Sequence, residues 1–236
     1  MLQEPVKLSK RLKAVAKFLP AGANFADIGS DHAYLPCYVC MKDPTALAIA
    51  GEVNEGPFES AKENVKIHGL ETRVSVRLGN GLEVIEVEDR VDHVVIAGMG
   101  GALITEILHA GKAKLAQVDR LILQPNVEAR KVRQWLYGNG YHLTAEQMLE
   151  EKGHIYEILV ADRHGSNPYD EVMKDKQFFF GPYLLKEKSP VFLKKWCMEK
   201  EKLTSIVIQM KKAETPNLEK IKQFTKELTW IEEVLQ

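Results

Sequence analysis

The chain has few cysteines and no long apolar run. Its three cysteines, Cys37, Cys40 and Cys197, are too few for a disulfide framework, which predicts a reducing compartment. Cys37 and Cys40 form a C-x-x-C pair, but no second pair completes a zinc site, so we expect ordinary helix cysteines and no metal. No apolar run approaches the roughly 18 residues of a membrane span, and the first residues lack the apolar region of a secretion signal. We therefore expect a cytoplasmic protein without a membrane partner.

An excess of charge of one sign is also absent. The chain has 236 residues, of which 32 are Lys or Arg and 33 are Asp or Glu, so the formal net charge is -1. The whole molecule therefore presents no basic field toward nucleic acid, and any such surface must come from local clusters. With 45% hydrophobic and 28% charged residues, the composition is that of a globular protein that buries a core.

The first 165 residues alternate between short apolar runs and longer stretches of helical spacing. Strands are expected at Asn24–Ile28, Ala46–Ala50, Arg73–Leu78, His93–Ala97 and Arg120–Leu123. Helices are expected at Ala33–Met41, Pro57–His68, Ala102–Ala110 and Val127–Tyr137. Because the strands carry few charges and alternate with helices, the pattern predicts βαβ units and an α/β fold with a parallel sheet covered on both faces.

The pattern changes after the last of these helices. Two further apolar segments, Tyr141–Thr144 and Tyr156–Val160, are separated by a charged turn at Glu150–Gly153. They predict an antiparallel hairpin at one edge of the sheet.

The C-terminal part is long, charged and helical. Residues 163–168 are polar turn formers and are interpreted as a linker. Beyond them we expect two helices, Val191–Lys212 and Leu218–Leu235, broken at 215–217. They predict a helical hairpin that resembles a short coiled coil and either binds RNA or mediates self-association. The expected domains are therefore 1–165 and 166–236.

The loop after the first expected strand is the most informative segment. Gly29 permits a tight turn, and the following helix N-terminus offers free N–H groups. A dinucleotide fingerprint would need three glycines here, whereas this loop has one glycine and two carboxylates, Asp27 and Asp31. Carboxylates repel a pyrophosphate but suit a ligand with an ammonium or sulfonium group. The loop therefore favours S-adenosylmethionine over NAD, although Asp31 alone could simply cap the helix.

Further polar residues follow the other expected strands. Glu52 follows the second strand and can accept hydrogen bonds from both ribose hydroxyls of an adenosyl ligand, although a solvated glutamate is common there. Asn80 lies between two glycines, where it either meets an adenine edge or forms a simple turn. Three glycines within Ala97–Gly101 let the backbone approach a ligand or begin a closely packed helix. Gln124 and Asn126 point two amides toward the same edge of the sheet.

A local basic cluster occurs near the start of the chain. Five basic residues and no acidic one lie between Val6 and Leu19, on a segment with one apolar helical face. These residues are Lys7, Lys10, Arg11, Lys13 and Lys17. A solvated amphipathic helix gives the same pattern, but phosphate contact is favoured if the substrate is RNA. Arg130, Lys131 and Arg133 could extend that surface, whereas the strand residues Arg73 and Arg77 are expected to be structural.

Several of these motifs together resemble one family. The opening Leu8–Leu12 (L-x-K-R-L), the block Asp27–Pro36 (DIGSDHAYLP), IAGMGG at 96–101 and LQPN at 123–126 resemble the bacterial tRNA (adenine(22)-N1)-methyltransferases, the TrmK family. The resemblance covers essentially the whole chain. It implies a class I Rossmann-like methyltransferase sheet with a C-terminal helical hairpin, S-adenosyl-L-methionine as cofactor, and N1 of an adenine in tRNA as methyl acceptor.

The resemblance and the residue patterns together define the predicted site. The expected cofactor contacts are Asp27, Gly29, Ser30, Asp31, His32, Glu52, Val53, Asn80, Gly81, Ala97, Gly98 and Met99. Asp31 and His32 are also the candidates for orienting the target base, and thus for a catalytic role. The expected RNA contacts are Lys7, Lys10, Arg11, Lys13, Gln124, Asn126, Arg130 and Arg133. Asn80 replaces an aspartate that is frequent in this fold, but its amide oxygen can still accept a hydrogen bond from the adenine amino group.

Other interpretations remain compatible with the residues. The chain could be an S-adenosylmethionine-dependent methyltransferase of another RNA, a protein or a small molecule, or a non-catalytic RNA-binding module. A nicotinamide dehydrogenase is disfavoured by the missing glycines. Amino-methyltransferases often carry N/D-P-P-Y/F after the fourth strand, where this chain has Ala97–Gly100, which agrees with a ring nitrogen as target.

Overall fold

The structure is a computed structural model that describes residues 6–236. The first five residues belong to the segment in which no secretion signal is expected, and they lie outside the described residues. The chain forms two compact units, one of Met1–Gln147 with Tyr156–Pro168 and one of Met148–Ile155 with Tyr169–Gln236. No helix within the described part is long and apolar enough to cross a membrane.

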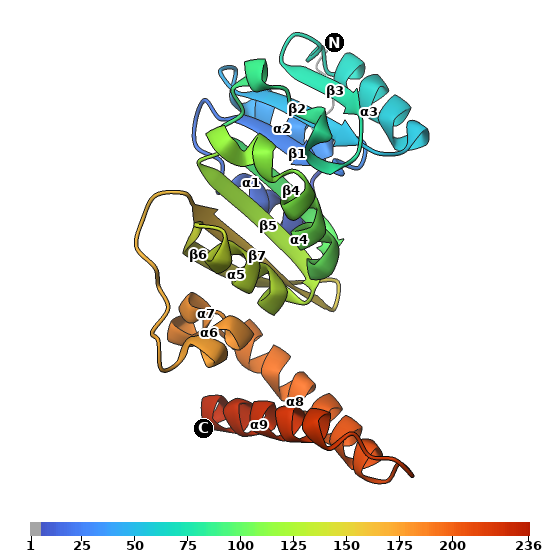
Figure 1. Ribbon diagram of the computed structural model, residues 1–236. Coiled ribbons are helices and arrows are strands. Elements are labelled where there is room, and N and C mark those ends of the chain that lie inside the picture. Colours follow the sequence, from blue (N-terminus) through green and yellow to red (C-terminus); the bar gives the residue numbers. More distant parts are fainter. Residues whose placement is uncertain (1–5) are drawn as a thin grey trace. The chain divides into compact units, whose positions relative to one another are not determined.

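A seven-stranded sheet in the order β3-β2-β1-β4-β5-β7-β6 is the framework of the first unit (Figure 1). The strands are β1 (Asn24–Ile28), β2 (Leu47–Glu52), β3 (Val74–Leu78), β4 (His93–Gly100), β5 (Arg120–Val127), β6 (His142–Glu151) and β7 (His154–Asp162). Strands β1 to β5 run parallel, and β7 pairs with β5 in the antiparallel direction. The predicted parallel sheet and the hairpin at its edge are therefore confirmed.

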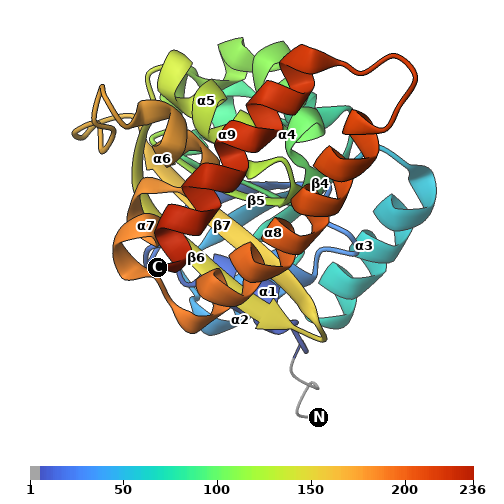
Figure 2. The same cartoon turned by 90° about the horizontal axis from the view of Figure 1, so that it is seen from below.

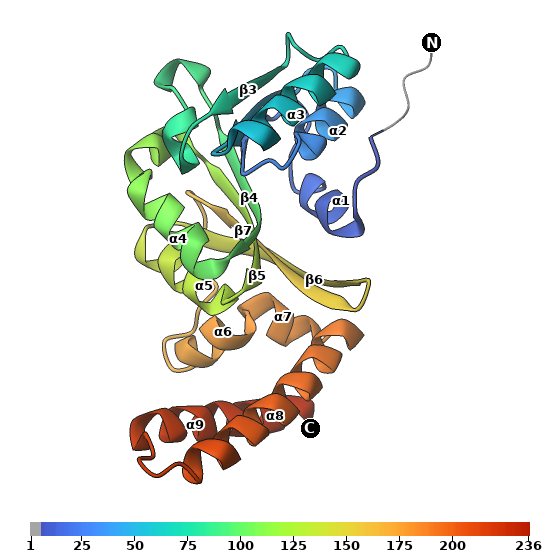
Figure 3. The same cartoon turned by 90° about the vertical axis from the view of Figure 1, so that its right-hand side faces the viewer.

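Helices cover both faces of this sheet, as Figure 3 shows: α1 to α3 lie on one side, and α4 and α5 on the other. They are α1 (Lys10–Ala16), α2 (Tyr34–Lys42), α3 (Glu55–Ile67), α4 (Gly101–Ala110) and α5 (Ala129–Gly138). Short 3-10 helices η1 (Gly81–Val84), η2 (Val87–Asp89) and η3 (Lys112–Gln117) fill the connections. Because both faces are covered, central strand residues such as Phe25, Val94 and Ile122 are fully buried.

The strand ends differ from the prediction where it matters for the site. Strands β4 and β5 run beyond the expected Ala97 and Leu123 to Gly100 and Val127. They continue to pair through register shifts after Ala97, so a bulge lies inside the paired region. The glycine-rich end of β4 is therefore held against β5 and is not a free loop.

The second unit is a small helical bundle with its own core. It contains α6 (Lys174–Phe180), α7 (Pro182–Glu187), α8 (Pro190–Lys211) and α9 (Leu218–Leu235). The side chains of Ser189 and Asn217 accept hydrogen bonds from the first turns of α8 and α9, and these two helices run side by side in Figure 2. The two long helices are confirmed, whereas α6 and α7 were not expected.

An aromatic cluster fills the core of this bundle. The ring centroids of Phe180 and Trp196 lie 4.4 Å apart, and Phe192 and Ile231 are buried beside them. Met148, from the tip of the β6–β7 hairpin, is buried in the same cluster. The hairpin tip therefore groups with the helices, and the chain does not divide at the single point after residue 165 that the pattern suggested.

Candidate active site

The carboxyl ends of β1 to β5 meet along one edge of the sheet. Strand order reverses between β1 and β4, and in open α/β sheets ligands bind in the crevice at this point. The register pairs Ile28 with Gly51 and Glu52 with Leu78, so the ends of the three strands are level. The structure thus brings the predicted cofactor residues together at one edge, in segments 27–32, 52–53, 80–81 and 97–99.

The loop after β1 has an unusual backbone. Gly29 has a φ of 67°. Three consecutive residues that are not glycine, Asp31, His32 and Ala33, also have positive φ values, of 47°, 69° and 58°. Consecutive left-handed residues other than glycine are strained and occur mainly at functional sites. Contacts from neighbouring elements hold the loop: the N–H groups of Gly29 and Ser30 donate to the carbonyl of Gly51 at 2.9 and 3.1 Å.

Two buried carboxyl groups face this loop. The exposed fractions of Asp27 and Glu52 are 4% and 5%. Burial raises the pKa of Asp27 to about 7, and the nearby Glu52 raises it too, against the hydrogen bond from Ser30 Oγ to Asp27 Oδ2 at 2.7 Å and the charge of Arg11. Burial also raises the pKa of Glu52, partly offset by hydrogen bonds from the backbone of Asp31 and His32. Two carboxyls at this edge are therefore costly to ionise in the free protein.

These carboxyls fit an adenosyl ligand that carries an ammonium group. The Oε1 atom of Glu52 is buried and has no hydrogen-bond partner among residues 6–236. A pair of ribose hydroxyls supplies the missing donors, and a cationic amino group offsets the cost of burying carboxylates. A pyrophosphate would be repelled. The residues present therefore match S-adenosylmethionine and not a dinucleotide.

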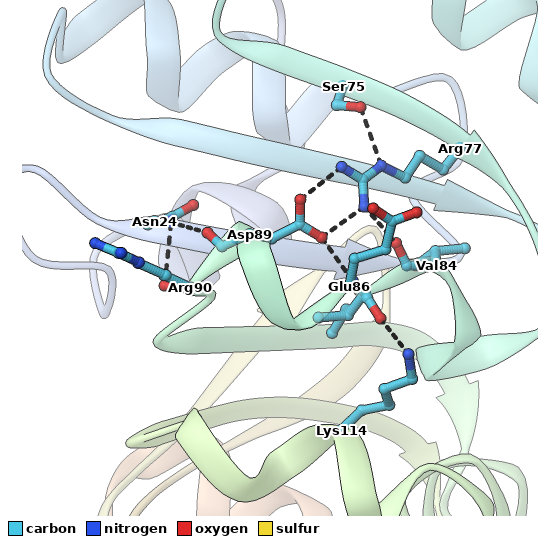
Figure 4. A network of polar contacts seen from close by, with 9 residues as sticks. Asn24, Ser75, Arg77, Val84, Glu86, Asp89, Arg90 and Lys114 are labelled. Carbon is cyan, nitrogen blue, oxygen red and sulfur yellow. Dashed lines mark hydrogen bonds and ion pairs between the residues drawn. The ribbon is translucent and has the colours of Figure 1, made fainter.

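A polar network holds the loop that carries Asn80 and Gly81 (Figure 4). The guanidinium of Arg77 donates to both carboxylate oxygens of Asp89, at 2.6 and 2.7 Å, and to the carbonyl of Val84 at 2.8 Å. Asp89 Oδ2 also accepts from the backbone N–H of Glu86 at 2.6 Å. The structural role predicted for Arg77 is confirmed, and Asn80 itself is exposed at the start of this loop. Arg73 is likewise structural, because it donates to the carbonyls of Cys40 and Asp43.

The glycine-rich end of β4 is held by two amide side chains from β5. The N–H of Gly98 donates to Gln124 Oε1 at 3.0 Å, and Asn126 Nδ2 donates to the carbonyl of Gly98 at 2.7 Å. Gln124 Nε2 in turn donates to Asn126 Oδ1 at 3.2 Å. Gly98 has a φ of 83°, which favours glycine. Both backbone polar groups of Gly98 are therefore hydrogen-bonded, and Ala97 and Met99 lie half-buried on either side.

The candidates for orienting the base lie at the mouth of the site. The Asp31 side chain is 84% exposed, and its Oδ1 lies 3.4 Å from His32 Nε2. The His32 ring packs near Tyr34, with ring centroids 5.5 Å apart, and Val53 begins the exposed loop after β2. These positions leave the roles of Asp31 and His32 as predictions.

Two predicted RNA contacts are wrong. Gln124 is fully buried, because its amide is used within the β4–β5 pairing described above. Arg133 is also fully buried: its guanidinium pairs with Glu146 Oε1 at 2.7 Å and with Glu157. The packing of α5 on β6 and β7 turns Arg133 inward. The signal in the sequence for a buried Arg133 is the presence of two glutamates, Glu146 and Glu157, in strands that also carry buried apolar residues.

The other predicted RNA residues occupy different positions. Lys7, Lys10 and Lys13 are exposed, as expected, and Asn126 is exposed near the end of β5. Arg11 differs, because its side chain is half-buried and hydrogen-bonds to Gln124. The sequence pattern placed it on the solvent side with its neighbours. The C-x-x-C cysteines are buried in the helix region as expected, and burial raises the pKa of the thiols of Cys37 and Cys40 to about 12 and about 11.

Strand order and site together define a class I, Rossmann-like methyltransferase. The family model described as TrmK: tRNA (adenine(22)-N(1))-methyltransferase matches residues 25–233, so the chain belongs to this family. It is 48% identical over 233 residues to the tRNA (adenine(22)-N(1))-methyltransferase of Bacillus subtilis, covering 98% of each chain.

Solved structures give the same result. The crystal structure of B. subtilis TrmK is 47% identical, covers 98% of this chain and 100% of its own, and has a TM-score of 0.91. Streptococcus pneumoniae Sp1610 in complex with S-adenosyl-L-methionine is 44% identical, with the same coverage of both chains and a TM-score of 0.87.

Proposed function

We propose that this chain transfers the methyl group of S-adenosylmethionine to N1 of the adenine at position 22 of tRNA, and that it acts in the cytoplasm. Beyond family membership, the observation that carries the proposal is the pair of buried carboxyls at the ends of β1 and β2. Asp27 and Glu52 are nine-tenths or more buried, and Glu52 Oε1 lacks a donor among the described residues.

Each end of the cofactor has a suitable group on this edge. In this proposal Glu52 accepts hydrogen bonds from the ribose hydroxyls, and Asp27, which accepts a hydrogen bond from Ser30, supplies negative charge for the ammonium group. Asn80 and Gly81 are the proposed contacts of the adenine edge. When bound, S-adenosylmethionine supplies a methyl group already activated by the positive sulfonium. The task of the protein is therefore to bind, align and exclude water.

The chemistry of the acceptor atom determines how the protein must present the target adenine to the cofactor. N1 of adenine carries a free lone pair near neutral pH, but base pairing occupies it, so the base must be unpaired and presented in line with the methyl–sulfur bond. Such alignment can contribute up to about 7–11 kcal/mol in favourable cases. No proton has to leave N1 before attack. This chemistry fits the end of β4 at Ala97–Met99, where backbone groups are available to contact the base. Asp31 and His32 are the candidates for holding the base.

The tRNA surface is proposed to be local. Lys7, Lys10 and Lys13 are exposed on or just before α1, whereas Asn126 lies near the end of β5 and Arg130 in α5. With a net charge of -1, the chain depends on such clusters for phosphate contacts.

Methylation of transcribed tRNA tests the function. Unmodified tRNA is incubated with the protein and methyl-labelled cofactor, beside a matched transcript with guanine at position 22. We expect label in the first RNA only, located at adenine 22 by nuclease mapping. Equal labelling of both transcripts would contradict the position, and cofactor binding without any labelling would contradict tRNA as substrate.

A further inference from the structure

The neighbouring basic residues of helix α1 lie in different surroundings. Lys10 and Lys13 are exposed, whereas Arg11 between them is half-buried. Its guanidinium donates to Gln124 Oε1, and its Cζ atom lies 5.5 Å from the centroid of the Tyr156 ring on β7. Arg11 therefore belongs to the sheet edge and not to the solvent face of α1.

The contacts of Arg11 lead directly to Gly98. The Oε1 atom of Gln124 accepts from both the Arg11 guanidinium and the N–H of Gly98. A Cβ atom added to Gly98 would lie 3.4 Å from Arg11 Nη1, so the guanidinium lies beside this part of the backbone. Arg11 is thus the outer member of a chain of hydrogen bonds that fixes the peptide at the bulge of β4.

This chain of contacts lies at the reversal of strand order. Gly98 lies at the bulge in the β4–β5 pairing, and β1, which ends at Ile28, pairs with β4 as far as Ile96. The positive charge of Arg11 acts on the buried carboxyl of Asp27. The guanidinium therefore stands beside the crevice in which the open sheet binds its ligands.

We propose that Arg11 is a positioning residue for the methyl-accepting adenine. It acts through Gln124 on the peptide of Gly98, which borders the place where N1 is presented. Because Arg11 shares a helix with Lys10 and Lys13, it also connects the proposed tRNA-binding face of α1 to the transfer site. This inference rests on the proposed function.

The test compares Arg11→Ala with Lys13→Ala, a basic residue two positions away on the same helix. For Arg11→Ala we expect kcat on tRNA to fall by about ten- to a hundredfold, the range for one lost charge-assisted hydrogen bond. The salt dependence of tRNA binding should match the wild type, and kcat is measured at saturating S-adenosylmethionine because the Arg11 charge also acts on Asp27. Lys13→Ala should instead raise KM for tRNA and flatten the salt dependence.

A conservative variant separates positioning from charge and from folding. Arg11→Lys keeps the charge but lacks the planar fork that bridges to Gln124, so it should not restore kcat. If Arg11→Ala lowers the melting temperature by more than a few degrees, the kcat of Arg11→Lys is used in its place to test the positioning role. Unchanged kcat in a folded Arg11 variant, or an effect confined to KM and salt dependence, would overturn the inference. A wild-type protein that methylates no tRNA would instead overturn the proposed function.

Discussion

At the scale of single residues, the buried carboxyls of Asp27 and Glu52 give the clearest indication of a ligand-binding site. Both lie at the ends of adjacent parallel strands, and both are buried without a basic side chain in a salt bridge to them among residues 6–236. Buried carboxyls of this kind cost stability unless a ligand or partner compensates them. The arrangement therefore favours ligand binding over stability of the free protein.

Replacing Glu52 tests its proposed ribose contact. Glu52→Gln keeps the shape but removes the charge, so the affinity for S-adenosylmethionine should fall by about ten- to a hundredfold, while tRNA affinity stays near wild type. Titration calorimetry with the cofactor measures this. The matched control is Glu55→Gln, an exposed glutamate in the first turn of α3, which should bind cofactor normally. Wild-type affinity in Glu52→Gln would remove Glu52 from the site.

Asp27 predicts a pH dependence of stability. Burial raises its pKa from the ordinary 3.8 to about 7 in the folded chain, so the folded state holds a proton that the unfolded chain releases more easily. The unfolding free energy should therefore fall as pH rises from about 4 to about 7, by an amount on the order of a few kcal/mol. Asp27→Asn should remove much of this fall. Denaturant titrations between pH 4 and 8 check it, and an identical pH dependence in both proteins would contradict it.

At the scale of elements, α5 is joined to the β6–β7 hairpin by a buried ionic group. Arg133 from α5 pairs with Glu146 of β6 and Glu157 of β7, and all three are nine-tenths or more buried. Removing only the cation leaves two uncompensated carboxylates in the interior. The buried ion pairs explain why Arg133, which the sequence pattern assigned to RNA binding, points into the interior.

Arg133→Met should therefore destabilise the fold by about 3–5 kcal/mol in urea unfolding. Lys131→Met is the control, since its exposed pair with Glu128 should contribute less than about 1 kcal/mol. A loss as small as that of the control would show that the buried group does not hold α5 to the hairpin.

The sequence predicts an element of this fold where the pattern that indicates it lies within the element's own residues. The five parallel strands are apolar runs bounded by turn residues, and their common polarity places Asp27, Glu52 and Asn80 at one edge without further information. Helices α6 and α7 are short, and their aromatic residues gather irregularly, so no period indicates them. The inward turns of Arg11 and Arg133 depend on Gln124, Glu146 and Glu157 from distant strands. No local pattern contains such partners.

At the scale of the whole molecule, each of the two compact units has a core of its own. The first unit buries its sheet between helices, and the second has an aromatic core of its own. Because the net charge is only -1, affinity for a polyanion must come from local basic surfaces, and the α1 lysines are the proposed one. A molecule of this kind recognises its RNA at particular points and not through a general field.

The most direct test of the central claim replaces a single atom of the substrate. A tRNA carrying 1-deazaadenosine at position 22 has a C–H in place of N1, whereas 7-deazaadenosine at the same position retains N1. With the full-length protein and methyl-labelled S-adenosylmethionine, we expect the 7-deaza RNA to accept one methyl group at position 22 and the 1-deaza RNA to accept none there. Methylation of residue 22 in the 1-deaza RNA would contradict transfer to N1 and, with it, the proposed function.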